Sequence, residues 1–116
     1  MADCLFCRII AGELPSTQHH ASDLVIAFED IAPQAPLHLL IVPREHIGSA
    51  ADLRDTPQHA ALLARMHAVA AELAAAAGYA DRGWRLVSNV GDEGGQAIKH
   101  LHYHLLAGRQ LAWPPG

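Results

Sequence analysis

The sequence is poor in cysteine, in aromatic residues and in basic charge. Only Cys4 and Cys7 are cysteines, and aromatic residues make up 5% of the 116 positions. Eight Lys and Arg against twelve Asp and Glu give a net charge of −4, which argues against a general nucleic-acid-binding protein, since such proteins carry a basic stripe. No apolar run reaches the length of a membrane span, and the first residues lack the basic region of a signal peptide. We therefore expect a cytoplasmic protein that binds neither nucleic acid nor membrane.

The length and composition predict one globular domain over residues 1–116. Hydrophobic residues make up 51% of the chain and charged residues 17%, enough apolar side chain to bury a core without covalent staples. In the cytoplasm, Cys4 and Cys7 are not expected to form a structural disulfide. Their Cys-x-x-Cys spacing favours metal binding or redox chemistry, with two buried small side chains as the alternative.

Turn residues divide the chain into short elements. We expect a short helix or turn over 4–11, strands over 24–29, 37–42, 84–90 and 100–106, and one long helix over 56–77. Thr56 and Pro57 suit the start of that helix and Gly78 its end. Its apolar residues at helical spacing, expected to form the buried stripe, are Leu63, Met66, Ala70, Leu73 and Ala77. The pattern predicts an α+β fold with an antiparallel sheet. The remaining histidines, His19, His20, His59 and His67, are expected in a polar loop or on the helix surface.

Three histidines alternate in the last expected strand, at His100, His102 and His104. Because successive side chains of a strand point to opposite faces, the three imidazoles share one face, while Leu101, Tyr103 and Leu105 point into the core. A row of imidazoles offers nucleophiles, proton carriers, metal ligands or phosphate donors near neutral pH. The three need not share one role, since one can bind a metal while two face a substrate.

A glycine-rich loop directly precedes the histidines. Asn89 ends one expected strand, and Gly91, Gly94, Gly95 and Gln96 lead into the next. Glycines allow a backbone to turn its N–H groups toward an anion. Alone, this loop indicates only a turn between two strands. Together with the histidine row and the Asn89 and Gln96 amides, it predicts a phosphate-binding site.

These features resemble the histidine-triad superfamily, whose motif reads His-φ-His-φ-His-φ-φ with φ apolar, as residues 100–106 do. The likeness to the Hint branch extends over nearly the whole chain. Its further marks are Phe6, 8–10, 12–15, 27–31, 33–36, 38–43, Asn89, 94–96, 108–110 and 113–116. So many matches in order are far more specific than the triad alone.

The resemblance implies an enzyme that binds purine nucleoside monophosphates and hydrolyses nucleoside phosphoramidates and related acyl- or aminoacyl-nucleotides. His102 would attack the α-phosphorus and form a nucleotidyl-histidine that water then hydrolyses. The carbonyl of His100 would fix the tautomer of His102, and His38 would bond near the nucleophile. A lone histidine in an apolar strand is otherwise more often a hydrogen-bonded core residue.

The resemblance also assigns the nucleotide contacts. His104 and Asn89 would hold the phosphate, the backbone N–H groups of Gly95, Gln96 and Ala97 would stabilise its charge, and Asp30 would accept the ribose hydroxyls. The wall of the base pocket would be formed by Leu5, Phe6, Ile9, Phe28, Ile31 and Leu40, which on their own would suggest ordinary core packing. Members of the branch are homodimers whose central helices and strands pack into one continuous sheet. The resemblance therefore implies a sheet continued across a homodimer, in which Trp113 would reach toward the partner's active site and shape leaving-group specificity.

One position departs from the branch. The residue after Gln96 is often serine, whose hydroxyl helps protonate the leaving amine, whereas here it is Ala97. The backbone N–H is retained, but the rate and the leaving-group preference become uncertain, and water or His104 would have to supply the proton.

A zinc site is implied by the same resemblance. In many bacterial members, paired cysteines bind zinc together with the histidine of a Pro-Arg-x-His segment and the first triad histidine. The corresponding residues are Cys4, Cys7, His46 and His100. A closed set of two cysteines and two histidines would make one structural zinc per chain, tying the N-terminus to the catalytic segment.

Three alternatives remain from the sequence. The first is a dinucleoside polyphosphate hydrolase or nucleotidyl transferase of another branch, which His104 and the Trp-Pro-Pro-Gly end oppose. The second is a nucleotide-binding or scaffold protein with weak catalysis, which Ala97 keeps open. The third is a structural zinc module in which the triad only binds metal.

Overall fold

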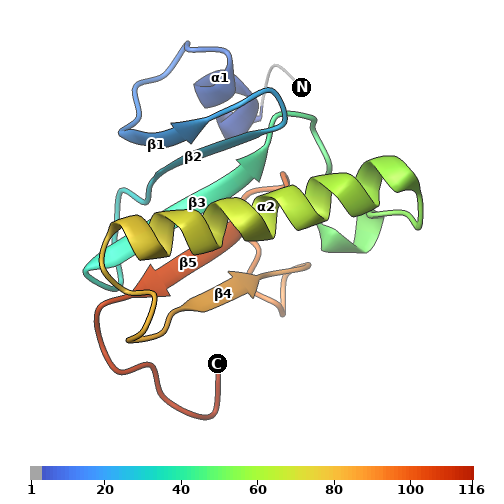
Figure 1. The fold of residues 1–116 in the computed structure, drawn as a ribbon. Helices are drawn as coiled ribbons and strands as arrows, with labels where there is room; N and C mark the ends of the chain where they lie inside the picture. Colours follow the sequence, from blue (N-terminus) through green and yellow to red (C-terminus); the bar gives the residue numbers. More distant parts are fainter. Residues whose placement is uncertain (1–3) are drawn as a thin grey trace.

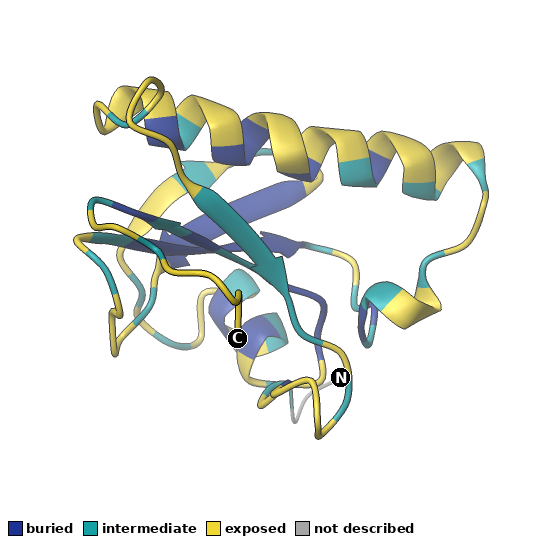
Figure 2. Ribbon diagram, turned by 90° about the horizontal axis from the view of Figure 1, so that it is seen from below, coloured by how far each residue is buried: buried dark blue, intermediate teal, exposed yellow. Residues whose placement is uncertain are grey.

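A five-stranded antiparallel sheet carries one long helix on one face and a short helix on the other (Figures 1 and 2). The computed structural model describes residues 4–116. The helices are α1 Leu5–Ile10, the 3-10 turn Ala50–Asp52 and α2 Pro57–Ala76. The strands are β1 Gln18–Ala21, β2 Val25–Glu29, β3 Leu37–Pro43, β4 Arg85–Ser88 and β5 Tyr103–Ala107, in the order β1-β2-β3-β5-β4. The α+β fold predicted from the sequence is confirmed.

Strands β2 and β3 are buried on both faces, which explains their largely apolar sequences. In β2 and β3, alternate residues such as Val25 and Leu39 belong to the core under α2, while Ile26 and Leu40 belong to a second cluster on the other face. Because both faces of the sheet are covered, neither strand shows the alternation typical of a half-exposed strand. The second cluster packs α1 against the sheet through Phe6 and Ile9, and thereby places α1 beside the histidines.

Helix α2 begins as its sequence predicts, but its buried stripe is shifted. The Thr56 hydroxyl accepts a hydrogen bond from the His59 N–H, and Gly78 adopts a positive φ of 90° just beyond the helix. The buried residues are Leu62, Met66, Val69, Ala70 and Ala74. The expected stripe is confirmed at Met66 and Ala70, and the half-buried Leu73 packs against the same core. It was wrong at its two ends, because Leu62 takes the buried place expected for Leu63 and Ala77 is exposed past the last turn.

The histidine strand is shorter than predicted. Strand β5 starts at Tyr103, so His100, Leu101 and His102 precede it. The neighbouring β3 ends at Pro43, which lacks the N–H that a longer ladder would need. The Leu101 N–H instead donates to the Ile47 carbonyl at 2.6 Å. Leu101 and Leu105 are nevertheless buried and Tyr103 packs against the same core, as the alternation predicted.

Two edge strands also differ from the sequence prediction. Strand β1, which contains His19 and His20, was expected to be a polar loop; it is an exposed edge strand paired with β2. Strand β4 covers only part of the strand expected over 84–90. Strand β1 buries little apolar surface, so hydrophobic periodicity does not mark it.

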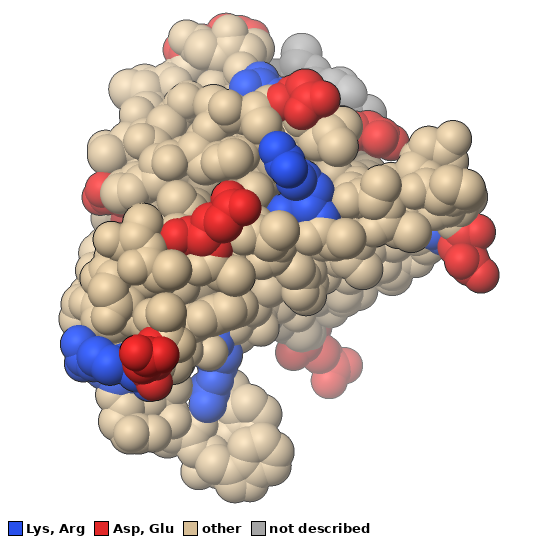
Figure 3. Space-filling model, in the orientation of Figure 1, with Lys and Arg blue, Asp and Glu red and all other residues tan. Residues whose placement is uncertain are grey.

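Charged side chains are scattered on the face that α2 covers (Figure 3). Lys and Arg alternate there with Asp and Glu, and this face carries no continuous basic patch. Within residues 4–116, no helix has both the length and the apolar character required to cross a membrane.

Candidate active site and metal centre

A pocket of about 900 Å³ is lined by Leu5, Phe6 and Ile9 of α1, the helix that packs in the core cluster on the sheet face opposite α2. Two triad histidines, His102 and His104, stand on one side of it, and Asp30 lies at its edge. All six apolar residues expected around a base line it: Leu5, Phe6, Ile9, Phe28, Ile31 and Leu40. Gly95 and Ala97 supply the glycine-loop side. The pocket lining thus combines apolar side chains with imidazole, carboxylate and backbone groups.

The tautomer of His102 is fixed by a backbone carbonyl. His102 Nδ1 lies 2.7 Å from the carbonyl oxygen of His100. Because a carbonyl only accepts, Nδ1 carries the proton and Nε2 carries the lone pair. The ring is buried and packs edge to face with the ring of Phe6 at a centroid distance of 5.0 Å. His102 therefore has the protonation pattern of a nucleophile, in a rigid setting.

His38 and His104 form a second ordered pair. The Gln34 N–H donates to His38 Nδ1 at 3.0 Å, so the proton of a neutral His38 is on Nε2. His38 Nε2–H donates to His104 Nδ1 at 2.9 Å. Asp30 Oδ2 lies 3.4 Å from His38 Nε2. His104 consequently carries its proton on Nε2. The two hydrogen bonds from the Gln34 N–H to His38 and from His38 to His104 thus leave His104 Nε2–H as a donor toward the pocket.

Burial keeps this pair neutral. Desolvation lowers the pKa of His38, although the Asp30 charge opposes the shift. Desolvation also lowers the pKa of His104, and the neighbouring His102 and His38 add to the effect. Two neutral imidazoles preserve the alternation of donors and acceptors, which an added proton would break.

We expect stability to fall with acid below pH ~6.5, the ordinary histidine value. Below this pH, His38 and His104 are protonated in the unfolded chain but stay neutral in the folded protein, where their pKa values are lowered. The free energy of unfolding therefore decreases as the pH drops toward the lowered pKa values of the folded state. Each group contributes up to about 1.4 kcal/mol per pH unit. Chemical denaturation of wild type and His38→Gln across this window tests it. If the unfolding free energies of the two proteins ran parallel across this pH range, the prediction would be contradicted, because their difference removes every acid effect that the two proteins share.

The glycine loop differs from the expected arrangement at Gln96. Its buried amide donates to the carbonyls of Gly48 and Ile98 and accepts from the Gly91 N–H. The Gly95 and Gln96 N–H groups also donate within the loop. The expectation that the Gln96 amide faces a phosphate is therefore wrong, since Gln96 instead holds the loop together. Of the three expected backbone donors, Ala97 N–H is the one that does not form these loop bonds.

Two further expected contacts lie outside the pocket lining. The Asn89 amide donates to the Gly94 carbonyl at 2.7 Å and borders a second hollow of about 430 Å³ on the other side of His104. At Gly94 a Cβ would stand 2.2 Å from the Val90 carbonyl oxygen, so only glycine fits there. Trp113 is 84% exposed, and its expected reach toward a partner stays a prediction.

Sequence reasoning assigned no role to several residues of the pocket rim. Leu14, Pro15, Ser16, Thr17, Glu29, Pro33 and Ile98 also line it. Leu14, Pro15, Glu29 and Pro33 belong to segments that carry the resemblance. No sequence pattern indicated a role for Ser16, Thr17 or Ile98.

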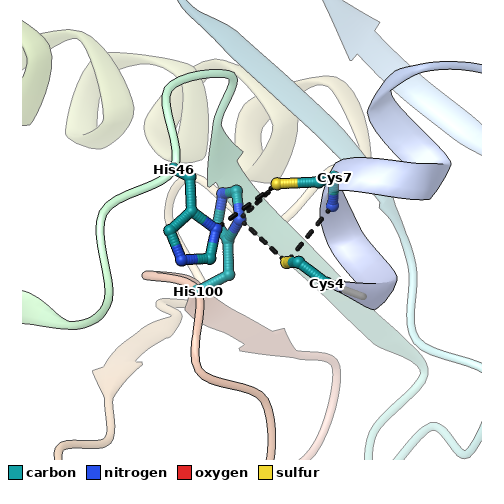
Figure 4. Close-up of side chains that lie close together, drawn as sticks. All are labelled: Cys4, Cys7, His46 and His100. Carbon is teal, nitrogen blue, oxygen red and sulfur yellow. Dashed lines mark hydrogen bonds between the residues drawn. The ribbon is translucent and has the colours of Figure 1, made fainter. Parts of the chain in front are cut away.

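Four side chains from distant parts of the chain meet at the other end of the histidine segment (Figure 4). Cys4 precedes α1, Cys7 lies within α1, His46 follows β3, and His100 precedes β5. His100 Nδ1 lies 3.4 Å from Cys4 Sγ and 3.6 Å from Cys7 Sγ, and His46 Nδ1 lies 3.3 Å from Cys7 Sγ. All four ligand atoms lie within 4.8 Å of one another.

These distances fit one tetrahedral ion. Bond lengths of about 2.0–2.3 Å place the ligand atoms of a zinc tetrahedron roughly 3.3–3.8 Å apart. The buried His100 donates Nε2–H to the Pro43 carbonyl at 2.9 Å, which leaves the Nδ1 lone pair facing the sulfurs. Burial lowers the pKa of His100, so the ring is in the neutral form that binds a metal. Burial and the neighbouring Cys4 raise the pKa of the Cys7 thiol, a cost that a bound cation would remove.

Comparisons with known proteins agree with this geometry. A family model described as "Scavenger mRNA decapping enzyme C-term binding" matches residues 3–112. The purine nucleoside phosphoramidase of Escherichia coli is 44% identical, with 94% of this chain and 90% of that protein covered. A 14 kDa zinc-binding protein of Brassica juncea is 40% identical over 98% of this chain and 100% of that protein.

A solved structure gives the same result. The crystal structure of a HIT family hydrolase from Legionella pneumophila superposes with a TM-score of 0.94 at 48% identity, covering 98% of this chain and 100% of that one. Because the family model and these relatives span nearly all of the chain, including the histidine segment, the chain belongs to the histidine-triad (HIT) family.

Proposed function

We propose that this protein hydrolyses purine nucleoside 5′-phosphoramidates, and related acyl- or aminoacyl-nucleotides, to the nucleoside monophosphate. The observation that carries the proposal is the protonation pattern beside the pocket. His102 presents a lone pair on Nε2 and His104 presents an N–H, each set by a chain of hydrogen bonds. A nucleophile next to a donor is what displacement at a phosphate requires. The relative from Escherichia coli, named a purine nucleoside phosphoramidase, supports the choice of substrate.

In the first step, His102 Nε2 forms a bond to the α-phosphorus and the P–N bond breaks. The electron pair of that bond leaves with the amine, which takes a proton from solvent water because Ala97 has no hydroxyl to give one; the water that later attacks the phosphorus returns a proton to solvent. The His100 carbonyl holds the Nδ1 proton of His102 and stabilises the positive charge that grows on the ring. His104 Nε2–H and the Ala97 N–H stabilise the phosphate oxygens. Water then attacks the nucleotidyl-histidine, releasing the monophosphate and restoring His102.

The other end of the substrate is bound by the rest of the pocket. Phe6 and Phe28 pack edge to face at 5.6 Å and, with Leu40, give the pocket an apolar, aromatic lining suited to a purine. Asp30 Oδ1 accepts from the Ala32 N–H, which orients the carboxylate at the pocket edge, where ribose hydroxyls would reach it. We propose zinc as the ion of the Cys4–Cys7–His46–His100 cluster, in a structural role.

The direct test is hydrolysis of adenosine 5′-phosphoramidate by the purified chain, with zinc content measured on the same sample. We expect release of ammonia and AMP. A folded protein that binds AMP but leaves this substrate intact would refute the enzyme proposal. It would favour the alternative of a nucleotide-binding protein, for which the missing hydroxyl at Ala97 is the supporting observation.

Ala97→Ser is expected to raise the rate with a poorly leaving amine. Ala97 lines the pocket, and a hydroxyl there supplies a proton to the departing nitrogen, an effect of about a hundredfold on kcat, the low end of general acid catalysis. Substrates with an acidic leaving group need no such proton and serve as the matched control. A pre-steady-state comparison of the two substrate types in both proteins measures it. Equal acceleration of both would contradict proton donation by the hydroxyl.

A further inference from the structure

The end of β5 closes tightly on the loop that precedes β3. At Gly108, with a φ of 99°, a Cβ would stand 2.7 Å from Pro36 Cβ and 2.9 Å from Tyr79 Oη. Only glycine permits both this backbone conformation and this approach. Because the chain turns here, the next residue, Arg109, is brought over the loop that contains Gln34.

Arg109 fastens that loop. Its Nε donates to the Gln34 carbonyl at 2.8 Å, and its Nη1 donates to the Gln110 carbonyl at 3.3 Å. The N–H of the same residue, Gln34, donates to His38 Nδ1 at 3.0 Å. The guanidinium therefore fixes the residue whose N–H determines the tautomer of His38, although Arg109 itself does not line the nucleotide pocket.

The tautomer of His38 decides which nitrogen of His104 carries its proton. With Gln34 in place, His38 Nε2–H donates to His104 Nδ1 and His104 keeps a proton on Nε2. If the Gln34 N–H moved away, His38 could take its proton on Nδ1 and accept from His104 at Nε2. His104 would then face a phosphate with a lone pair, which repels oxygen anions instead of stabilising them.

The same arrangement explains why a proton lies between these rings although their spacing would suit a metal. Asp30, His38 and His104 offer ligand atoms that all lie within 4.8 Å of one another. A His38 that accepts from Gln34 at Nδ1 has no lone pair on Nε2 to give to an ion. The backbone hydrogen bond thus favours an acid–base pair over a second metal site.

We propose that Arg109 is a positioning residue for the reaction, holding Gln34 so that His38 and His104 keep the tautomers that direct an N–H at the phosphate. The kinetic part of this inference rests on the proposed function, whereas the tautomer part does not. A positioning residue of this kind affects the transition state, where charge on the phosphate oxygens grows, more than it affects substrate binding.

The experiment compares Arg109→Met, Arg109→Lys and Arg85→Met with wild type, all as the full chain loaded with zinc. Arg85 Nη2 donates to the Ala112 carbonyl at 2.9 Å, so Arg85→Met is a matched loss of an arginine–carbonyl bond that leaves Gln34 untouched. Long-range nitrogen–proton NMR on isotope-labelled histidine identifies which ring nitrogen is protonated. Steady-state hydrolysis of adenosine 5′-phosphoramidate separates kcat from KM.

In Arg109→Met we expect His38 to change from one tautomer to a mixture and kcat to fall about tenfold with KM nearly unchanged. Arg109→Lys restores a donor to Gln34 and should recover most of both signals, and Arg85→Met should match wild type. Unchanged histidine tautomers in Arg109→Met would overturn the inference, as would a rate loss that appears only in KM. Should wild type itself fail to hydrolyse the substrate, the proposed function fails, and the NMR comparison alone decides the role of Arg109.

Discussion

His102→Ala is expected to abolish hydrolysis of adenosine 5′-phosphoramidate while leaving the fold intact. The nucleophile of a covalent mechanism cannot be bypassed without losing the intermediate, so we expect a fall in kcat of about 10⁴-fold or more. The side chain contacts the rings of Phe6 and His104 and bonds to the His100 carbonyl, and alanine removes these contacts without touching the sheet core. The metal cluster does not include His102, so zinc content and AMP binding should remain near those of wild type.

The covalent intermediate gives an independent measurement of the same assignment. Wild type mixed briefly with substrate and quenched should carry the mass of one added nucleotidyl group on the peptide that contains His102. The His102→Ala peptide should carry none. His67→Ala provides the matched control, because His67 is an exposed histidine on α2, on the opposite face of the sheet. A nucleotidyl group found on His104, or residual turnover in His102→Ala close to wild type, would overturn the assignment of the nucleophile.

The parts of the fold that depend on burial were readable from the sequence. β2, β3 and the start of α2 followed apolar runs and capping residues, because side-chain burial and backbone hydrogen bonds at helix ends are local properties. Strand β1 was missed for the converse reason, since an exposed edge strand is held by its pairing with β2 and buries little of its own. The residues around His100 depend on Ile47 and Pro43, more than fifty positions away, and no local pattern reports such partners.

In the site, too, local sequence predicted which residues lie together but not which atoms carry the protons. Alternation in the sequence placed three imidazoles on one face, but which ring nitrogen carries each proton depends on the carbonyls of Pro43 and His100 and on the Gln34 N–H. Residue identity does not encode these backbone positions. Gln96 illustrates the consequence: a side chain expected at the phosphate is used within the loop, because the buried Gly48 and Ile98 carbonyls need a donor.

Cys4→Ser is expected to lose the metal and much of the stability while leaving the catalytic histidines chemically intact. The cluster joins α1, the segment after β3 and the segment before β5, so a bound ion constrains three parts of the chain at once. Metal at about a thousandfold above its dissociation constant stabilises the folded state by about 4 kcal/mol. For a domain of this size that corresponds to a fall in Tm of roughly 15 °C on loss of the ion. Calorimetry together with metal analysis of wild type, Cys4→Ser and His67→Ala measures both quantities.

The comparison with His102→Ala separates the two halves of the histidine segment. His100 belongs to the cluster and His102 to the pocket, only two residues apart, so metal loss should also loosen Phe6 on α1 and weaken AMP binding without removing the nucleophile. We therefore expect Cys4→Ser to lose zinc and Tm with part of its turnover retained at low temperature, and His102→Ala to lose turnover with zinc and Tm retained. Equal loss of zinc in both variants would refute this division of roles, because it would mean that the pocket histidine also ligates the metal.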